Sequence, residues 1–337
     1  MIDLSTRFAG LILKNPLVPS ASPLMRDLEM AKRLEDAGAS ALVMHSMFEE
    51  ELAAEEALAD RFLRNAALGQ GEADGCLPDP GVFRGTTERY LEQLVRLKRH
   101  LDIPVIASLN GISRAGWIDL GREIEAAGAD ALELNVYYVA ADLSQSAADV
   151  ESRYVDLLNA LREAVRLPIV MKLSPHFTSL PHFVKQLETA GASGVALFNR
   201  FYQPDIDLDT LRIDNHLHLS SPDEALLRLR WLAILRGQVG LSLAATGGVH
   251  GHEEALKMLL AGADVVQMAS CLLRHGPERL ADILAGMTVW MESREYASVA
   301  QLKGCLSLAN LPDPSAVARD SYIHLVNPDE PAVGVWY

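Results

Sequence analysis

The chain has 337 residues, of which 49% are hydrophobic and 22% are charged. Acidic residues outnumber basic ones by 45 to 30, and the formal net charge of −15 disfavours nucleic acid and anionic membranes as main partners. This composition excludes the disordered, fibrous and disulfide-rich classes, and the length fits one large α/β barrel.

The three cysteines, Cys76, Cys271 and Cys305, lie far apart and form no CxxC motif or Cys/His cluster. We therefore expect no zinc or iron–sulfur site and a reducing compartment. The N-terminal segment lacks the basic and apolar regions of a signal peptide. The sequence also contains no run of about 18 apolar residues, which a membrane-spanning helix would need. The sequence thus predicts a cytoplasmic protein without a bound metal.

Eight short apolar runs, separated mostly by helix-like stretches, predict eight buried parallel strands. In chain order they lie near residues 16–20, 41–45, 104–109, 131–135, 168–173, 194–198, 241–246 and 264–268. Four of them follow a repeated Ala-Gly-Ala phrase, at 37–39, 127–129, 190–192 and 261–263. Each copy indicates a helix that ends at the glycine and leads directly into a strand.

Eight strand–helix units in one chain predict an α/β fold, the (β/α)8 or TIM barrel, as a single domain over residues 1–310. Two irregular segments, 64–87 and 200–225, are expected to be long lid loops on the C-terminal face of the barrel. Residues 311–337 are expected to form a tail that packs on the barrel or on a neighbouring subunit.

Barrel active sites lie at the C-terminal ends of the strands. The polar or small residues there are Ser20, Ala21, Ser22, His45, Ser46, Asn110, Asn135, Lys172, Asn199, Arg200, Gly247, Gly248, Ala269 and Ser270. A lysine on a buried strand indicates function, because an unpaired buried ammonium is costly; the alternative is an ion pair that closes the barrel.

Each of the three asparagines taken alone is better explained as a strand-end cap, but three at one rim favour ligand binding. Together they offer hydrogen-bond donors and acceptors to a planar heterocycle. Gly247, Gly248, Ala269 and Ser270 follow the seventh and eighth strands, where this fold binds phosphate. His45 is either catalytic or a satisfied polar residue. The pair His216 and His218 lacks a carboxylate cluster and does not indicate a metal site.

Several motifs together resemble the dihydroorotate dehydrogenase family of FMN barrels over about residues 3–290. They are NPLVPSAS, the lysine in LPIVMKLSP, LELN, FN, ATGGV and AGADVVQMAS. No apolar helical extension precedes the barrel, so the chain resembles the soluble class of the family. The resemblance implies FMN as cofactor, a small-molecule substrate and a homodimer.

Position by position, the resemblance implies that Ala21, Ser22, His45 and Ser46 lie near the flavin. Asn110 and Asn135 would bond flavin and substrate, and Asn199 would hold the substrate. Lys172 would face the N1/C2=O edge, where a cation stabilises the charge of the reduced ring. Ribityl and phosphate would lie among Ser221, Gly247, Gly248, Ala269 and Ser270.

The chain departs from the family pattern mainly where the substrate binds. Tyr138 stands at the position of the catalytic cysteine, and Ala140 at that of a substrate-binding asparagine. His45-Ser46 replaces a Lys-Ser pair, and Asn199-Arg200 replaces Asn-Ser or Asn-Thr. Ala73 and Asp74 stand where the first lid of the family has an asparagine.

Tyrosine is a weak base near neutral pH but a suitable proton donor, and Arg200 can pair with a carboxylate. We expect an FMN-dependent oxidoreductase that acts on a CH–CH bond of a small planar substrate, with Tyr138 and Lys172 as catalytic residues and poor activity on dihydroorotate. Two alternatives remain open: a flavin-free lyase or isomerase of a phosphorylated substrate that uses Lys172, and a non-catalytic flavoprotein subunit. Without cysteine clusters, any electron relay must come from a partner protein.

Overall fold

The computed structural model describes residues 2–52, 54, 85–111, 115–200, 203–214, 218–314 and 317. Its strands are β1 (Thr6–Phe8), β2 (Leu11–Leu13), β3 (Leu17–Pro19), β4 (Leu42–Val43), β5 (Met47–Phe48), β6 (Val105–Asn110), β7 (Ala131–Asn135), β8 (Ile169–Leu173), β9 (Gly194–Leu197), β10 (Asp205–Asp207), β11 (Arg212–Asp214), β12 (Ser242–Thr246) and β13 (Val265–Met268). Its α-helices are α1 (Leu28–Asp36), α3 (Thr86–His100), α4 (Ala115–Ala126), α5 (Ala147–Ala164), α6 (Leu180–Thr189), α7 (Ala225–Leu235), α8 (His252–Ala261), α9 (Ser270–His275), α10 (Arg279–Ser293) and α11 (Val299–Leu302), and its 3-10 helices are η1 (Pro23–Arg26) and η2 (Pro222–Glu224).

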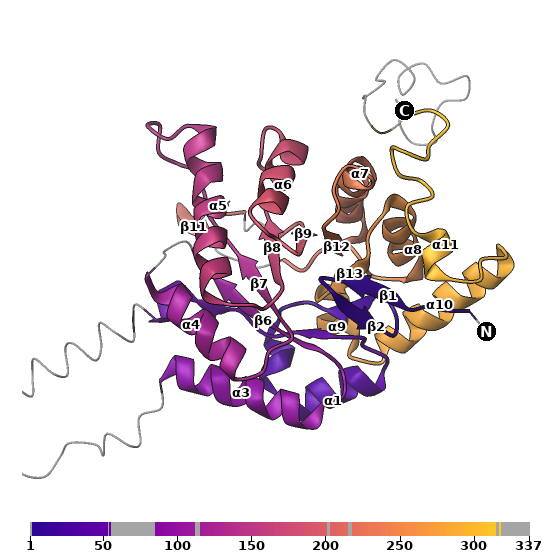
Figure 1. The fold of residues 1–337 in the computed structure, drawn as a ribbon, viewed down its shortest axis with the longest axis horizontal. Helices are drawn as coiled ribbons and strands as arrows, with labels where there is room; N and C mark the ends of the chain where they lie inside the picture. Colours follow the sequence, from indigo (N-terminus) through magenta and orange to yellow (C-terminus); the bar gives the residue numbers. More distant parts are fainter. Residues whose placement is uncertain are drawn as a thin grey trace, which may run out of the picture.

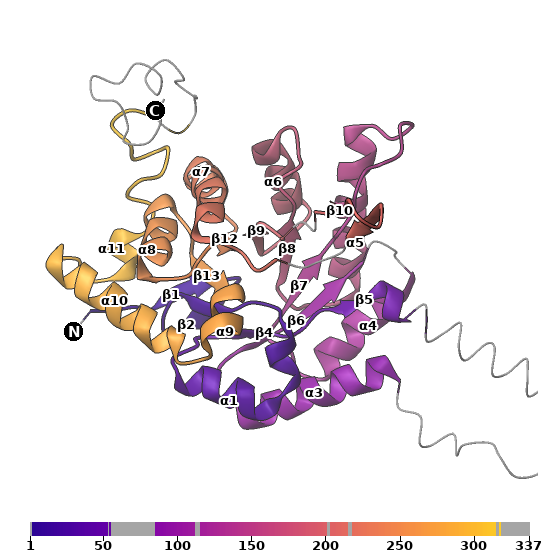
Figure 2. The ribbon, with the colours of Figure 1, turned by 180° about the vertical axis from the view of Figure 1, so that it is seen from behind.

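Eight parallel strands form a nearly closed barrel in the order β3-β13-β12-β9-β8-β7-β6-β4, with helices around it (Figure 1). Ser40 links the two end strands, because its N–H donates to Leu17 O over 3.1 Å and its hydroxyl donates to the same oxygen over 2.8 Å. Seen from behind, α1, α3 and α4 cover one side of the barrel and α5 to α8 the other (Figure 2). The predicted (β/α)8 barrel is confirmed, and every predicted strand overlaps an observed one.

The Ala-Gly-Ala phrases end α1, α4, α6 and α8, as expected. Their glycines, Gly38, Gly128, Gly191 and Gly262, have φ angles of +107°, +92°, +94° and +128°. Glycine adopts this left-handed region without a Cβ clash, so the chain leaves each helix and enters the next strand within a few residues.

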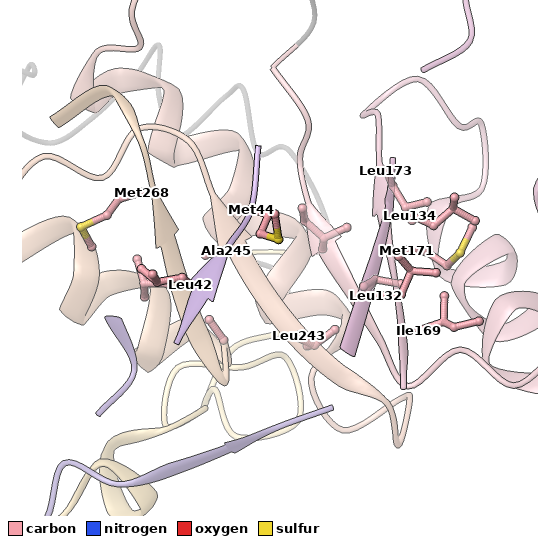
Figure 3. Packing of buried hydrophobic residues seen from close by; sticks show 14 of the residues in the cluster. Leu42, Met44, Leu132, Leu134, Ile169, Met171, Leu173, Leu243, Ala245 and Met268 are labelled. Atoms are coloured by element: carbon pink, nitrogen blue, oxygen red, sulfur yellow. The ribbon is translucent and has the colours of Figure 1, made fainter. Parts of the chain in front are cut away.

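Alternate strand residues pack in two separate cores. One set, which includes Leu132, Leu134, Ile169 and Met171, packs between the strands and the surrounding helices (Figure 3). The other set fills the inside of the barrel and includes Val18, Val43, Ile106, Val170 and Val265. The period of two along each strand therefore decides which side chains point outward and which point inward.

The β1–β2 hairpin was not expected from the sequence. Phe8 and Leu13 of this hairpin are fully buried in the inner core. The two connecting residues, Ala9 and Gly10, have φ angles of +49° and +84°, as in a type I′ hairpin turn. The hairpin therefore contributes to the apolar packing inside the barrel.

The prediction of a wholly irregular segment over 200–225 is wrong. Its described part contains the antiparallel ribbon β10–β11 and the 3-10 helix η2, and α7 begins at Ala225. The first lid segment, with Ala73, Asp74 and Cys76, lies almost entirely outside the described residues. Its only described residues are Gly85, Thr86 and Thr87, and α3 begins at Thr86.

His216 and most of the tail 311–337 also lie outside the described residues, so the packing of the tail stays a prediction. No helix in the described part of the chain has the length and apolarity needed to cross a bilayer.

Candidate active site

A pocket opens at the C-terminal ends of β3, β8, β9, β12 and β13. Ten of the predicted site residues line it: Ser20, Ala21, Ser22, Lys172, Asn199, Arg200, Gly247, Gly248, Ala269 and Ser270. Sequence reasoning missed further lining residues, among them Phe198, Ser220 and Glu224. The volume, about 210 Å³, is below the roughly 300–1,000 Å³ of common small-molecule sites, so the pocket has room for part of an extended ligand.

The glycine end of the pocket fits a phosphate group. Among the described residues, none accepts a hydrogen bond from the main-chain N–H of Gly247, Gly248 or Ala269. Gly248 has a φ of +78°, and a Cβ there would meet the nitrogen of Ala225 at 2.3 Å. Buried N–H groups are normally paired, so free ones beside a pocket suit an anionic ligand.

Ser220, rather than Ser221, lies on the pocket lining. The N–H of Ser220 donates to Ser270 Oγ over 3.0 Å, and its hydroxyl lies 3.2 Å from His250 Nε2. Ser221 is exposed and caps η2 together with Glu224. Burial, followed by the charge of Arg274, lowers the pKa of His250 below its usual value.

Lys172, which lines the pocket, belongs to a buried charged pair. Lys172 Nζ lies 3.0 Å from Glu133 Oε1, and the two side chains are only 7% and 1% exposed. Gln267 Nε2 donates to Glu133 Oε2 over 2.9 Å, and Lys172 also donates to Ser20 Oγ over 3.3 Å. The ion pair considered as the alternative role for Lys172 therefore exists, and its lysine lines the pocket. The sequence did contain a signal for Glu133 and Gln267, because each is a polar residue within an otherwise apolar strand, LELN and VVQM respectively.

The three asparagines meet at neighbouring strand ends. Asn110 and Asn135 are register partners at the ends of β6 and β7. Asn199 donates from Nδ2 to Asn135 Oδ1 over 2.9 Å. The amide cluster therefore lies beside the strand that carries Lys172.

His45 and Ser46 lie apart from this pocket. His45 lines a second hollow with Arg26, Arg89 and Tyr90, and its ring meets the Tyr90 ring edge-on with 5.2 Å between centroids. Its buried Nδ1 has no partner among the described residues. Burial and, to a lesser extent, Arg26 lower the pKa of His45 to about 4, so the ring is neutral near pH 7. The hydroxyl of Ser46 lies 2.9 Å from that of Ser108.

Tyr138 is half-buried and does not line the pocket. Its hydroxyl donates to Gln145 Oε1, and the guanidinium of Arg153 lies 4.6 Å from its ring centroid. Val139 and Ala140, which follow it, are exposed.

Arg200, by contrast, does line the pocket. Its Nη2 lies 3.6 Å from Glu224 Oε1, and its buried Nη1 has no partner in the described chain. Arg228 lies 4.0 Å from the same carboxylate and donates from Nε to Thr246 O. Among the described residues, Arg200 Nη1 is thus the buried guanidinium nitrogen of this group that has no partner.

The comparisons with known proteins agree with this geometry. The family model described as dihydroorotate dehydrogenase matches residues 3–291. A relative in Thermoplasma acidophilum, the catalytic subunit of dihydroorotate dehydrogenase B (NAD(+)), is 25% identical over 90% of this chain and 99% of its own length. Dihydroorotate dehydrogenase A (fumarate) of Lactobacillus delbrueckii subsp. bulgaricus is 26% identical over 83% of this chain and 90% of its own length. A putative dihydroorotate dehydrogenase A (fumarate) of Aeropyrum pernix is 27% identical over 90% of this chain and 97% of its own length.

Proposed function

Because the chain belongs to the dihydroorotate dehydrogenase family, we propose that it binds one FMN in the pocket at the ends of β3, β8, β9, β12 and β13. It is a flavin-dependent oxidoreductase that acts on CH–CH groups. One observation carries the proposal. The buried ammonium of Lys172 lines the same pocket as the main-chain N–H groups of Gly247, Gly248 and Ala269, which have no acceptor among the described residues. A cation and an anion cradle in one cleft suit a ligand with a phosphate at one end and a polar ring edge at the other.

In this arrangement the N–H groups of Gly247, Gly248, Ala269 and Ser270 hold the phosphate. The buried hydroxyl of Ser22, which has no partner among the described residues, is free to bond the cofactor beside Ala21. When bound, FMN supplies the ring atom that accepts or donates a hydride. Lys172 places a fixed positive charge where negative charge develops during the transfer. Asn110 lies at the end of β6 beside Asn135 and completes the ring side of the site, whereas His45 and Ser46 lie apart from the pocket.

Asn135, Asn199 and Arg200 bind the substrate. The free N–H of Arg200 favours a carboxylate, because a guanidinium pairs with carboxylates through two parallel hydrogen bonds. Tyr138 is the candidate proton donor because it follows β7 closely; its hydroxyl is held by Gln145 and does not line the pocket in this conformation. Among the described residues, the site has no strong base for the oxidation of dihydroorotate, so the substrate that we propose is another small, planar, unsaturated acid.

The flavin-free alternative fits the structure less well. A Schiff-base lysine needs a free lone pair on its nitrogen. Lys172 is instead ion-paired with a carboxylate that is 1% exposed. We further propose a homodimer, as the family resemblance implies. We also propose that the protein exchanges electrons with a partner protein, because relatives such as the Thermoplasma protein are named catalytic subunits.

The test is to purify the protein, release its cofactor by denaturation and identify it. We expect one FMN per chain and no FAD. The loaded protein is then reduced anaerobically and mixed with a panel of unsaturated carboxylic acids, while the oxidised protein is mixed with dihydropyrimidines. Return of the flavin colour with an unsaturated acid identifies the substrate class. A colourless protein that takes up no added FMN would refute the proposal.

A further inference from the structure

Both oxygens of the Glu133 carboxylate are engaged within the barrel. Oε1 lies 3.0 Å from Lys172 Nζ, and Oε2 accepts a hydrogen bond from Gln267 Nε2 over 2.9 Å. The second acceptor of Lys172 is the hydroxyl of Ser20, 3.3 Å away. Four strands therefore contribute to one buried polar layer: β7, β8 and β13 directly, and β3 through the residue that follows it.

Stability alone does not account for this layer. The layer next to it along the same strands is apolar, with Val18, Ala131, Val170 and Val265 in the inner core. A buried ion pair is generally no more stabilising than apolar residues of similar volume, because both charges lose their hydration. The polar layer also lies on the side where the pocket opens, and Lys172 belongs to the pocket lining. Its charges therefore act on whatever the pocket holds.

We propose that Glu133 is a positioning residue for Lys172 and that the pair, rather than the lysine alone, sets the reduction equilibrium of the bound flavin. The inference rests on the proposed FMN site. Glu133 and Ser20 hold the ammonium in one place below the pocket. The carboxylate also offsets part of the ammonium charge, and so limits how strongly the site favours the negative charge that the ring gains on two-electron reduction.

The decisive variant is Glu133→Gln, which keeps the shape of the side chain and removes its charge. Each FMN-loaded protein is titrated anaerobically with dithionite in the presence of a reference dye. We expect the equilibrium constant for reduction to rise at least tenfold, which for a two-electron couple is about 30 mV. Asp130→Asn is the matched control, because Asp130 directly precedes β7 and pairs with Lys98 at the opposite end of the barrel. We expect no change there.

A double-variant cycle separates action through Lys172 from a general field effect. Lys172→Met should lower the equilibrium constant, and adding Glu133→Gln to it should change the constant by no more than threefold. Equal effects of Glu133→Gln in both backgrounds, or an unchanged or lower constant in the single variant, would overturn the proposal. If Glu133→Gln does not fold, Gln267→Leu is the substitute, because it removes the donor to Oε2 of Glu133. We expect it to lower the equilibrium constant for reduction, and an unchanged constant in this variant would contradict the proposed role of Glu133.

The same measurements distinguish this inference from the proposed function. A wild-type protein that binds no FMN refutes both. A wild-type protein that holds FMN, with a potential that Glu133→Gln leaves unmoved, refutes only the role of Glu133.

Discussion

Asn199 donates a hydrogen bond from Nδ2 to Oδ1 of Asn135 over 2.9 Å, and so joins the ends of β9 and β7 across β8, which carries Lys172. Asn135 is only 6% exposed, so the bond fixes the orientation of an amide that has little access to water. The two residues expected to bind substrate thus support each other directly.

Replacing Asn199 by Ala leaves Oδ1 of Asn135 without its donor. We expect the KM for the substrate to rise about tenfold, which corresponds to roughly 1.4 kcal/mol, while flavin content stays unchanged. Steady-state kinetics and cofactor release measure the two effects. Asn159→Ala, on the exposed face of α5, serves as the control and should behave as wild type. Loss of flavin in the Asn199 variant would instead place this residue at the cofactor.

Gly248→Ala should empty the cofactor site and destabilise the protein. The added Cβ would lie 2.3 Å from the nitrogen of Ala225, at a φ of +78° that side chains rarely adopt. Gly248→Asp adds a charge that repels phosphate and should act at least as strongly. Gly116→Ala, where no atom lies within 4 Å of the added Cβ, should retain full flavin absorbance and is the control. Normal flavin content in both Gly248 variants would exclude the phosphate site assigned here.

Lys172→Met should slow flavin reduction far more than it weakens flavin binding. Loss of one preorganised charge partner costs about 10²–10³ in rate, or roughly 3–4 kcal/mol. The single variant also leaves Glu133 buried without its cation, at a cost of about 3–5 kcal/mol in unfolding free energy. The double variant with Glu133→Gln relieves that cost and should recover stability but not rate. Stopped-flow absorbance and urea unfolding report the two quantities, and an unimpaired rate would make the lysine purely structural.

Tyr138→Phe should slow the reduction of an unsaturated substrate by about 10², the usual contribution of a general acid. Gln145→Leu removes the acceptor that holds the hydroxyl and should leave the rate equal or faster. With dihydroorotate, the flavin of the wild-type protein should bleach slowly or not at all, because the Tyr138 hydroxyl donates its proton to Gln145 and is a proton donor rather than a base. Fast bleaching in the wild type that disappears in the Phe variant would make Tyr138 a base and dihydroorotate a substrate.

His45 should make the protein less stable in mild acid. Burial, followed by Arg26, lowers its pKa in the folded state to about 4, against an ordinary value of 6.5. Between these two values the unfolded chain binds a proton that the folded chain does not, so unfolding becomes easier as the pH falls through this window. His45→Gln should show a smaller drop in urea midpoint between pH 7 and pH 5 than the wild type. Equal drops would mean that His45 is protonated in the folded protein.

The sequence by itself determined the barrel, because its strands have a local signature. Each is a short apolar run, and four follow an Ala-Gly-Ala turn whose glycine adopts a positive φ. Position along a strand also determined which residues reach the C-terminal rim, so Lys172, Asn199, Gly248 and Ser270 could all be placed at one site from the sequence.

Only the tertiary structure decided which of these residues meet. Glu133 and Gln267 lie 134 positions apart, and their pairing follows from the closure of the sheet rather than from any local pattern. The same closure places His45 beside Tyr90 of α3 instead of in the main pocket, and it aligns Ser220 with Ser270. Such contacts depend on the order and register of strands that are distant in the chain. A pattern of alternating burial along one strand gives no information on either strand order or register.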